Sequence, residues 1–275
     1  MKGKLKLAVI SLLAIPMLLQ AQVRTEQTFK KGWKFTREDS KDFSRQDYND
    51  AKWQSVTVPH DWAIYGPFSV NNDKQNVAIA QDGQKEAMEH AGRTGGLPFV
   101  GVGWYRLNFE APASMAGKKA TLVFDGAMSH ARVYINGQEA GYWSYGYNSF
   151  FVDATPYLKA NEVNTLAVRL ENESESSRWY PGAGLYRNVH LVINEDVHIP
   201  VWGTVVTTPV VEEGFARVNV KTELVMPEGK KVSDYRIVTQ VKRADGKMLA
   251  SDDRPGNKLD ATFFNQNFVI YNPSL

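Results

Sequence analysis

The feature that most restricts the fold of this chain is a series of short segments in which apolar and polar residues alternate. Residues 131–135 alternate and are followed directly by Asn136-Gly137. This dipeptide is typical of a tight β-hairpin, because both turn positions take a positive φ angle. The alternation returns in residues 165–170 and 188–193. Since no long segment has the period of an amphipathic helix, an all-β chain is expected.

The strand pattern divides into two parts. Short strands separated by turn residues favour a sandwich or a jelly roll over residues 22–195. A second series of strands begins near Val197, and its members are residues 216–225, 235–242 and 262–270. About 80 residues in this pattern are typical of an immunoglobulin-like sandwich, which we expect over residues 196–275.

The first 21 residues have the pattern of an export signal. Three lysines within the first six residues precede an apolar stretch at residues 7–19, and Leu-Gln-Ala then provides a cleavage site. The stretch is shorter than the about 20 residues that a membrane-spanning helix needs. We therefore expect an exported protein, periplasmic or secreted, that has no membrane anchor and whose mature chain begins at Gln22.

The composition excludes several classes of function. The chain contains no cysteine, which excludes disulfides, thiol catalysis and a lipid anchor on cysteine. Its formal net charge is +2, with basic and acidic residues interleaved. This balance gives no sign of a nucleic-acid partner. No spacing of histidines and carboxylates indicates a metal site, and no cofactor is expected.

Residues 66–100 form a long polar segment with little periodicity. A loop of this length inside a compact domain is usually functional or disordered. We expect it to reach over a binding site, with disorder near residues 73–85 as the alternative. Residues 84–91 allow one short helical turn at most.

Three motifs in order resemble one enzyme family. They are WQSVTVPHDW at residues 53–62, GVGWYR at residues 101–106 and SRWYPGAGLYRNV at residues 177–189. Their order and spacing resemble the N-terminal sugar-binding domain of family 2 glycoside hydrolases, the β-galactosidase-like group. Residues 136–155 fit the same pattern. The resemblance covers essentially the whole mature chain and is weaker in its second half.

The resemblance implies an enzyme that is larger than this chain. In the family, a (β/α)8 barrel follows the immunoglobulin-like domain and carries both catalytic glutamates. We therefore expect a truncated, inactive part of a retaining exo-glycosidase, in which the last strand of the second sandwich is missing. Its partners would be the missing barrel, a carbohydrate with a terminal β-galactoside favoured, and a second subunit in an oligomeric enzyme.

Other functions fit the same residues. A fragment of a β-glucuronidase-like or β-mannosidase-like enzyme is one alternative, because these enzymes share the same N-terminal domains. A stand-alone carbohydrate-binding module is a further alternative, and so is a structural or adhesion sandwich without a ligand.

No residue of this chain is expected to be catalytic. Retaining glycosidases need two carboxyl groups about 5 Å apart. Neither Asp61 nor the acids at positions 171, 173 and 175 stand in a context that forces such a pair. His60-Asp61 would need an activated serine to form a triad, and the chain has no Gly-x-Ser-x-Gly motif.

Sugar binding is the chemistry that the third motif favours. Sugar rings stack their C–H faces on aromatic rings, and their hydroxyl groups hydrogen-bond to acids, amides and guanidinium groups. Arg178, Trp179 and Tyr180 offer this mixture, and Asp61 is a further candidate. The alternative for the two aromatic residues is packing at a domain junction. For Arg178 it is an ion pair with Asp61 or Glu175.

The resemblance also separates sugar contacts from scaffold. In the family, the jelly roll lends side chains to the edge of the sugar pocket of the barrel. Arg178 and the loop at residues 92–102 are the positions that match this role. A scaffold role is expected for Trp104, Tyr105, Tyr186 and Arg187.

Overall fold

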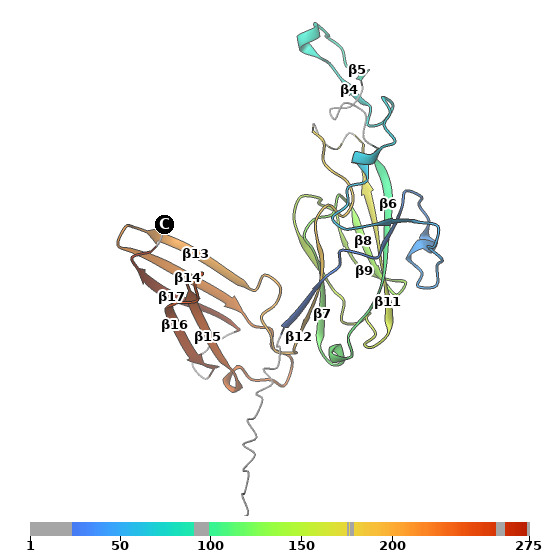
Figure 1. The fold of residues 1–275 in the computed structure, drawn as a ribbon. Helices are drawn as coiled ribbons and strands as arrows, with labels where there is room; N and C mark the ends of the chain where they lie inside the picture. Colours follow the sequence, from blue (N-terminus) through green and yellow to red (C-terminus); the bar gives the residue numbers. More distant parts are fainter. Residues whose placement is uncertain (1–23, 91–98, 175, 177–178, 257–261, 274–275) are drawn as a thin grey trace, which may run out of the picture.

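The computed structural model describes residues 24–90, 99–174, 176, 179–256 and 262–273. The expected export signal lies outside these residues. Strands and short 3-10 helices make up the regular structure of the described chain, and the strands build two β-sandwiches (Figure 1). The expectation of an all-β fold is confirmed. In the described ranges, no helix is long and apolar enough to span a membrane.

The first sandwich consists of a four-stranded and a six-stranded sheet, in which every strand pair is antiparallel. The four-stranded sheet has the order β1 (Arg24–Thr28), β12 (Val189–Asn194), β7 (Lys119–Phe124) and β10 (Phe150–Asp153). The six-stranded sheet has the order β3 (Gln54–Val56), β2 (Trp33–Thr36), β6 (Gly101–Glu110), β11 (Val163–Asn172), β8 (Ala131–Ile135) and β9 (Gln138–Trp143). Apart from β2 with β3 and β8 with β9, the neighbouring strands are not consecutive in sequence, as in a jelly roll.

The hydrophobic core lies between these two sheets. Leu166 on β11 pairs with Leu107 on β6, and both side chains are buried. On β8, Ala131 and Val133 are buried while Arg132 between them is exposed. This alternation is the reason that the sequence pattern identifies the strand, because successive side chains point to opposite faces of a sheet.

The turn between β8 and β9 is the tight hairpin expected from the sequence. Asn136 has a φ angle of 51° and Gly137 one of 84°. Both turn residues are therefore in the left-handed region that this type of turn requires. The hairpin prediction is confirmed.

Arg106 fastens a loop to the outer face of the six-stranded sheet. Its side chain is 1% exposed and forms an ion pair with Asp50, with Nε 2.9 Å from Oδ2. It also donates to the backbone carbonyl oxygens of Phe43, Arg45 and Tyr48. One guanidinium group thus holds residues 43–50 against β6.

The second sandwich follows after residues 195–203. One of its sheets contains β13 (Thr204–Val211), β14 (Phe215–Glu223) and β17 (Phe263–Tyr271), and the other contains β15 (Arg236–Lys242) and β16 (Met248–Pro255). The three strands expected here agree with β14, β15 and β17 to within two residues. In the described chain, β17 is an edge strand with β14 as its neighbour in the sheet.

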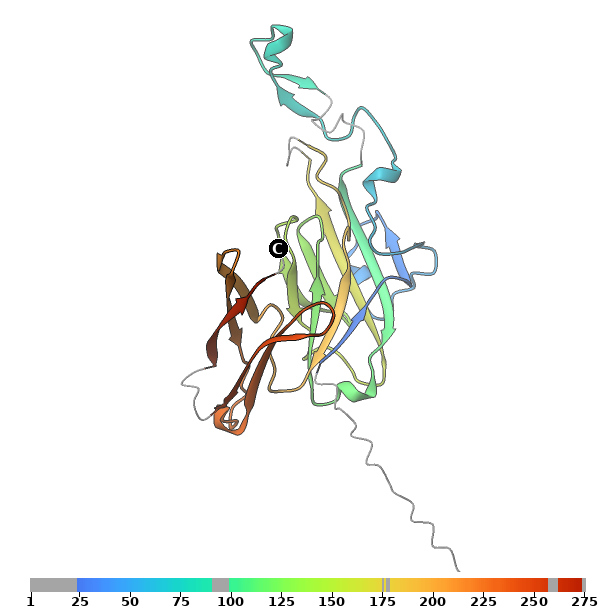
Figure 2. The same ribbon diagram turned by 60° about the vertical axis from the view of Figure 1, so that its left-hand side comes forward.

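The long polar segment contains a small hairpin that projects from one end of the first sandwich (Figures 1 and 2). Its strands are β4 (Gln75–Val77) and β5 (Met88–His90). The helical turn allowed at residues 84–91 is therefore wrong, because β5 extends to pair with β4. The 3-10 helices of the chain are η1 (Lys41–Ser44), η2 (Ala63–Tyr65), η3 (Ala80–Asp82), η4 (Ala113–Met115) and η5 (Val232–Asp234).

Candidate functional site

Two of the sugar-binding candidates, Asp61 and Tyr180, are in direct contact. The phenolic hydroxyl of Tyr180 donates a hydrogen bond to Asp61 Oδ2 at 2.6 Å. Asp61 Oδ1 accepts the backbone N–H of Ala63 at 3.0 Å, where η2 begins. Burial and the adjacent carboxylate raise the pKa of Tyr180 well above its ordinary value. Tyr180 therefore remains a neutral hydrogen-bond donor near neutral pH.

Trp179 lies in a group of exposed aromatic side chains. Trp179 is 57% exposed, and its indole Nε1 donates a hydrogen bond to the hydroxyl of Tyr147 at 2.9 Å. The rings of Tyr147 and Tyr145 lie 5.6 Å apart, and both residues are exposed. We call this group the aromatic cluster, and it consists of Tyr145, Tyr147, Trp179 and Tyr180 with Asp61 as its acid.

Tyr145 and Tyr147 were not among the candidates from the sequence. They lie between β9 and β10 on either side of Gly146, whose carbonyl accepts a hydrogen bond of 2.6 Å from Tyr186. The signal that points to them is two tyrosines flanking a glycine in a turn, where an aromatic side chain has no core position to fill. Tyr186 supports this turn from the third motif.

Arg178 lies outside the described residues, as does most of the 92–102 loop. Their expected contacts with a sugar therefore stay predictions. The candidates that the structure describes are Asp61, Trp179 and Tyr180, and all three belong to the aromatic cluster.

His60, next to Asp61, is held in the fold rather than presented for catalysis. Its Nδ1 lies 2.7 Å from the hydroxyl of Tyr105, and its backbone N–H donates to the carbonyl of Leu185 at 2.7 Å. Burial lowers the pKa of His60, which favours the neutral imidazole. Burial also raises the pKa of Tyr105, whose side chain is fully buried.

The three sequence motifs meet beside this histidine. Trp62 of the first motif packs on Gly103 of the second, where a Cβ atom would lie 2.5 Å from the indole ring. Gly184 of the third motif has a φ angle of 79°, and a Cβ there would collide with the hydroxyl of Tyr105. The glycines of the motifs are thus sites of close approach, and this packing positions Asp61 and Tyr180.

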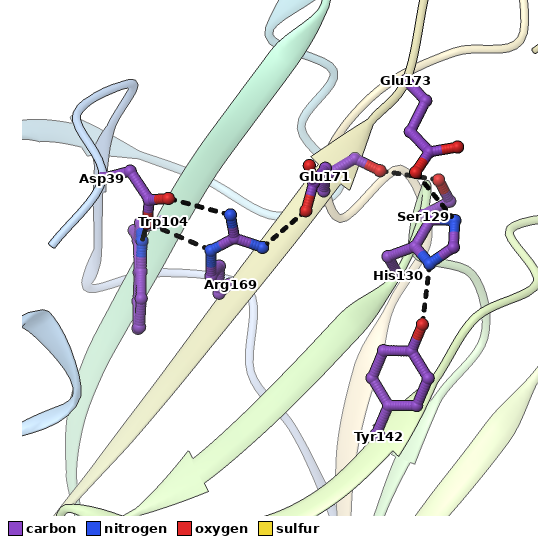
Figure 3. Close-up of polar contacts among 8 residues, drawn as sticks. All are labelled: Asp39, Trp104, Ser129, His130, Tyr142, Arg169, Glu171 and Glu173. Carbon is purple, nitrogen blue, oxygen red and sulfur yellow. Dashed lines mark hydrogen bonds and ion pairs between the residues drawn. The ribbon is translucent and has the colours of Figure 1, made fainter. Parts of the chain in front are cut away.

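A second polar constellation lies on the outer face of the six-stranded sheet (Figure 3). Arg169 donates to both oxygens of Asp39, at 3.0 and 2.8 Å, and to Glu171 at 2.8 Å. Asp39 also accepts the indole N–H of Trp104 at 2.8 Å. The hydrogen bonds from Arg169 lower the pKa of Asp39, and those to Asp39 raise the pKa of Arg169. The carboxylates of Asp39 and Glu171 thus share one guanidinium group.

The serine and histidine in Figure 3 do not form a nucleophile with its base. The hydroxyl of Ser129 donates to the backbone carbonyl of Glu171 at 2.7 Å. His130 instead faces Tyr142, with Nδ1 2.7 Å from the hydroxyl, and Glu173, with Nε2 3.7 Å from Oε1. An activated serine needs a hydrogen bond from its hydroxyl group to the base. In the part of the chain that the structure covers, no group of three or more histidines and acids is arranged to hold a metal ion.

Curated relatives match nearly the whole chain but only a fraction of their own length. A β-galactosidase of Bacteroides ovatus is 36% identical over 256 residues, which are 92% of this chain and 28% of the relative. A putative β-glucuronidase of Formosa agariphila is 33% identical over 202 residues, which are 73% of this chain and 18% of the relative. The chain therefore spans less than a third of the length of these proteins.

Solved structures show the same relationship. A glycosyl hydrolase family 2 member from Bacteroides cellulosilyticus superimposes with a TM-score of 0.75 at 30% identity, over 91% of this chain and 31% of that one. A β-glycosidase from Bacteroides vulgatus gives a TM-score of 0.71 at 27% identity, over 91% of this chain and 30% of that one. Residues 31–194 match the family model described as glycosyl hydrolases family 2, sugar binding domain. The chain belongs to glycosyl hydrolase family 2 and contains the sugar-binding domain of that family.

Proposed function

We propose that this chain is the non-catalytic, carbohydrate-binding part of a family 2 glycosidase, whose intact form removes a terminal β-galactoside with retention of configuration. The observation that carries the proposal is the aromatic cluster. Its exposed rings offer stacking surfaces for the C–H faces of a sugar, and Asp61 offers a fixed acceptor beside Tyr180. A sugar pocket needs this combination of a largely apolar wall and a few placed polar groups.

Hydrolysis is assigned to a part of the intact enzyme outside this chain. The acid that contacts the cluster, Asp61, is engaged by Tyr180 and by the backbone of η2. A retaining mechanism needs a second carboxyl group about 5 Å from the first, with one acting as acid and the other as nucleophile. Asp61 therefore acts in binding and positioning.

The names of the similar enzymes support one sugar over another. The β-galactosidase of Bacteroides ovatus supports a galactoside, and the β-glucuronidases of Formosa agariphila support a glucuronide as the alternative. The pattern of the first 21 residues supports export of the protein to the periplasm or the medium. An oligomeric intact enzyme stays a prediction.

The test is binding and turnover by the purified chain. Saturation-transfer NMR with methyl β-galactoside should show binding that is weakened in Trp179→Ala and unchanged in Tyr271→Ala, a control at an exposed tyrosine of the second sandwich. Nitrophenyl β-galactoside should remain uncleaved. Turnover by contaminant-free protein, or binding that is the same in Trp179→Ala, would contradict the proposal.

A further inference from the structure

A small cavity lies on the outer face of the four-stranded sheet, where the chain crosses from the first sandwich to the second. Its volume is about 160 Å³. Its floor is formed by Val123 on β7 and Val192 on β12. Both side chains point away from the core, because the residues that flank them in each strand belong to the core. Val201 and Trp202 line the cavity from the connection between the sandwiches.

A rigid set of polar groups borders this floor. His190 Nε2 lies 3.0 Å from Asp125 Oδ2, and His190 Nδ1 lies 3.2 Å from Glu26 Oε1. Arg24 contacts the other oxygen of Glu26 at 3.4 Å. A neutral imidazole donates to one of the two carboxylates, and Nδ1 also lies 3.0 Å from the hydroxyl of Thr28. Each carboxylate keeps acceptor capacity for further donors. Such an arrangement suits ligand hydroxyl groups, which donate and accept at the same time.

Trp202 adds an aromatic surface to the cavity. The residue is 54% exposed although it carries one of the largest apolar side chains. The ring of Phe151 on β10 meets it edge-on at a centroid distance of 5.4 Å and so fixes the orientation of the indole. Its φ angle of 58° lies in the left-handed region, which non-glycine residues adopt at an energetic cost. The backbone conformation and Phe151 together hold the exposed indole at the cavity.

We propose that this cavity binds one neutral hexopyranose unit of a glycan, with its ring stacked on Trp202 and its hydroxyl groups bonded to Asp125, Glu26 and Arg24. With a neutral imidazole at His190, the two carboxylates outnumber the single arginine, so a sugar carboxylate is repelled and a uronic acid is disfavoured. The site shares no residue with the aromatic cluster. It goes beyond the proposed function, because it would let the protein hold a glycan at two places at once.

The experiment is a titration of the complete chain with methyl β-galactoside, methyl β-glucoside and methyl β-glucuronide, followed by ¹H–¹⁵N NMR. We expect the Trp202 indole signal and the Val123 and Val192 amide signals to shift with at least one of the two neutral sugars. The affinity should fall at least tenfold in Trp202→Ala. Trp202→Phe, which keeps a stacking surface, should stay within about threefold of the wild type.

Two further variants separate this site from its alternatives. Asp125→Asn, which leaves the junction between the sandwiches unchanged, should also lower the affinity, and it covers the case in which Trp202→Ala does not fold. Trp179→Ala removes binding at the aromatic cluster and should leave the shifts at Val123 and Val192 in place. The proposal is overturned if no sugar shifts these signals, or if Asp125→Asn binds as the wild type does. It is also overturned if the glucuronide binds best.

Discussion

Tyr180 donates a hydrogen bond of 2.6 Å to Asp61 across 119 positions of sequence. The bond connects the end of the first sequence motif to the start of the third. Because Asp61 also accepts the backbone N–H of Ala63, one carboxylate fixes a turn and an aromatic side chain together. The candidate sugar surface is therefore built from residues that are only brought together by the complete jelly roll.

Replacing Tyr180 by phenylalanine removes this bond and keeps the ring. We expect a loss of roughly 1 kcal/mol in the free energy of unfolding, the usual size for one hydrogen bond. Urea denaturation measures it, with Tyr271→Phe, at a strongly exposed tyrosine, as the control. Sugar binding should weaken as well, because the ring loses its fixed orientation. Equal stability of the two variants would show that the bond contributes nothing.

Gly103 tests the packing between the first and second motifs. A methyl group there would lie 2.5 Å from the indole of Trp62, so Gly103→Ala must displace a buried ring. We expect a loss of about 1–3 kcal/mol, as for other overpacked cores. Gly214→Ala is the control, since no atom lies within 4 Å of its added Cβ. A melting temperature for Gly103→Ala equal to that of the control would refute the close approach.

His60 should make the stability depend on pH. Burial lowers its pKa in the folded state, so the unfolded chain binds the proton more readily. The stability from the neutral ring is complete above the unfolded pKa of about 6.5, and it is lost as the pH falls from there through the lower folded pKa. Unfolding in urea at several values between pH 7.5 and pH 5 should show a steeper loss for the wild type than for His60→Asn. Parallel curves would exclude this role.

Replacing Arg106 by lysine should destabilise the fold. A lysine keeps the charge, but it cannot reproduce the planar set of donors that reaches Asp50 and three backbone carbonyls. We expect Arg106→Lys to cost about 3 kcal/mol, in the range for a broken buried ion pair. The control Arg132→Lys affects an exposed pair with Glu139 and should cost less than about 1 kcal/mol. Chemical denaturation measures the stability of both variants. Similar losses of stability would contradict a special role for the buried Arg106 side chain.

The fold was accessible from the sequence because its strands are half buried. A strand such as β8 alternates between core and solvent, and its turn to β9 needs two residues with positive φ, which Asn136-Gly137 supplies. The projecting hairpin was missed for the opposite reason. In β4 and β5, both short and outside the hydrophobic core, the buried residue is the polar Gln75, so no apolar alternation marks the strands.

The candidate site was accessible only in part. Trp179 and Tyr180 stand beside a Pro-Gly break in a family-like motif, and Asp61 ends another such motif. Tyr145 and Tyr147 join them only through the tertiary fold, which local sequence does not encode. Trp202 was missed because an exposed aromatic side chain in a connection has no periodic signal.

The pairing of β1 with β12 determines how late the four-stranded sheet can form during synthesis of the chain. Thr28 lies opposite His190, so the first described strand finds its partner only when nearly all of the jelly roll has left the ribosome. Until β12 is made, β1 has no partner and β7 has an open edge, and contacts this distant in sequence form slowly. Synthesis from the N-terminus thus leaves a long interval in which unpaired strand edges are exposed on the nascent chain.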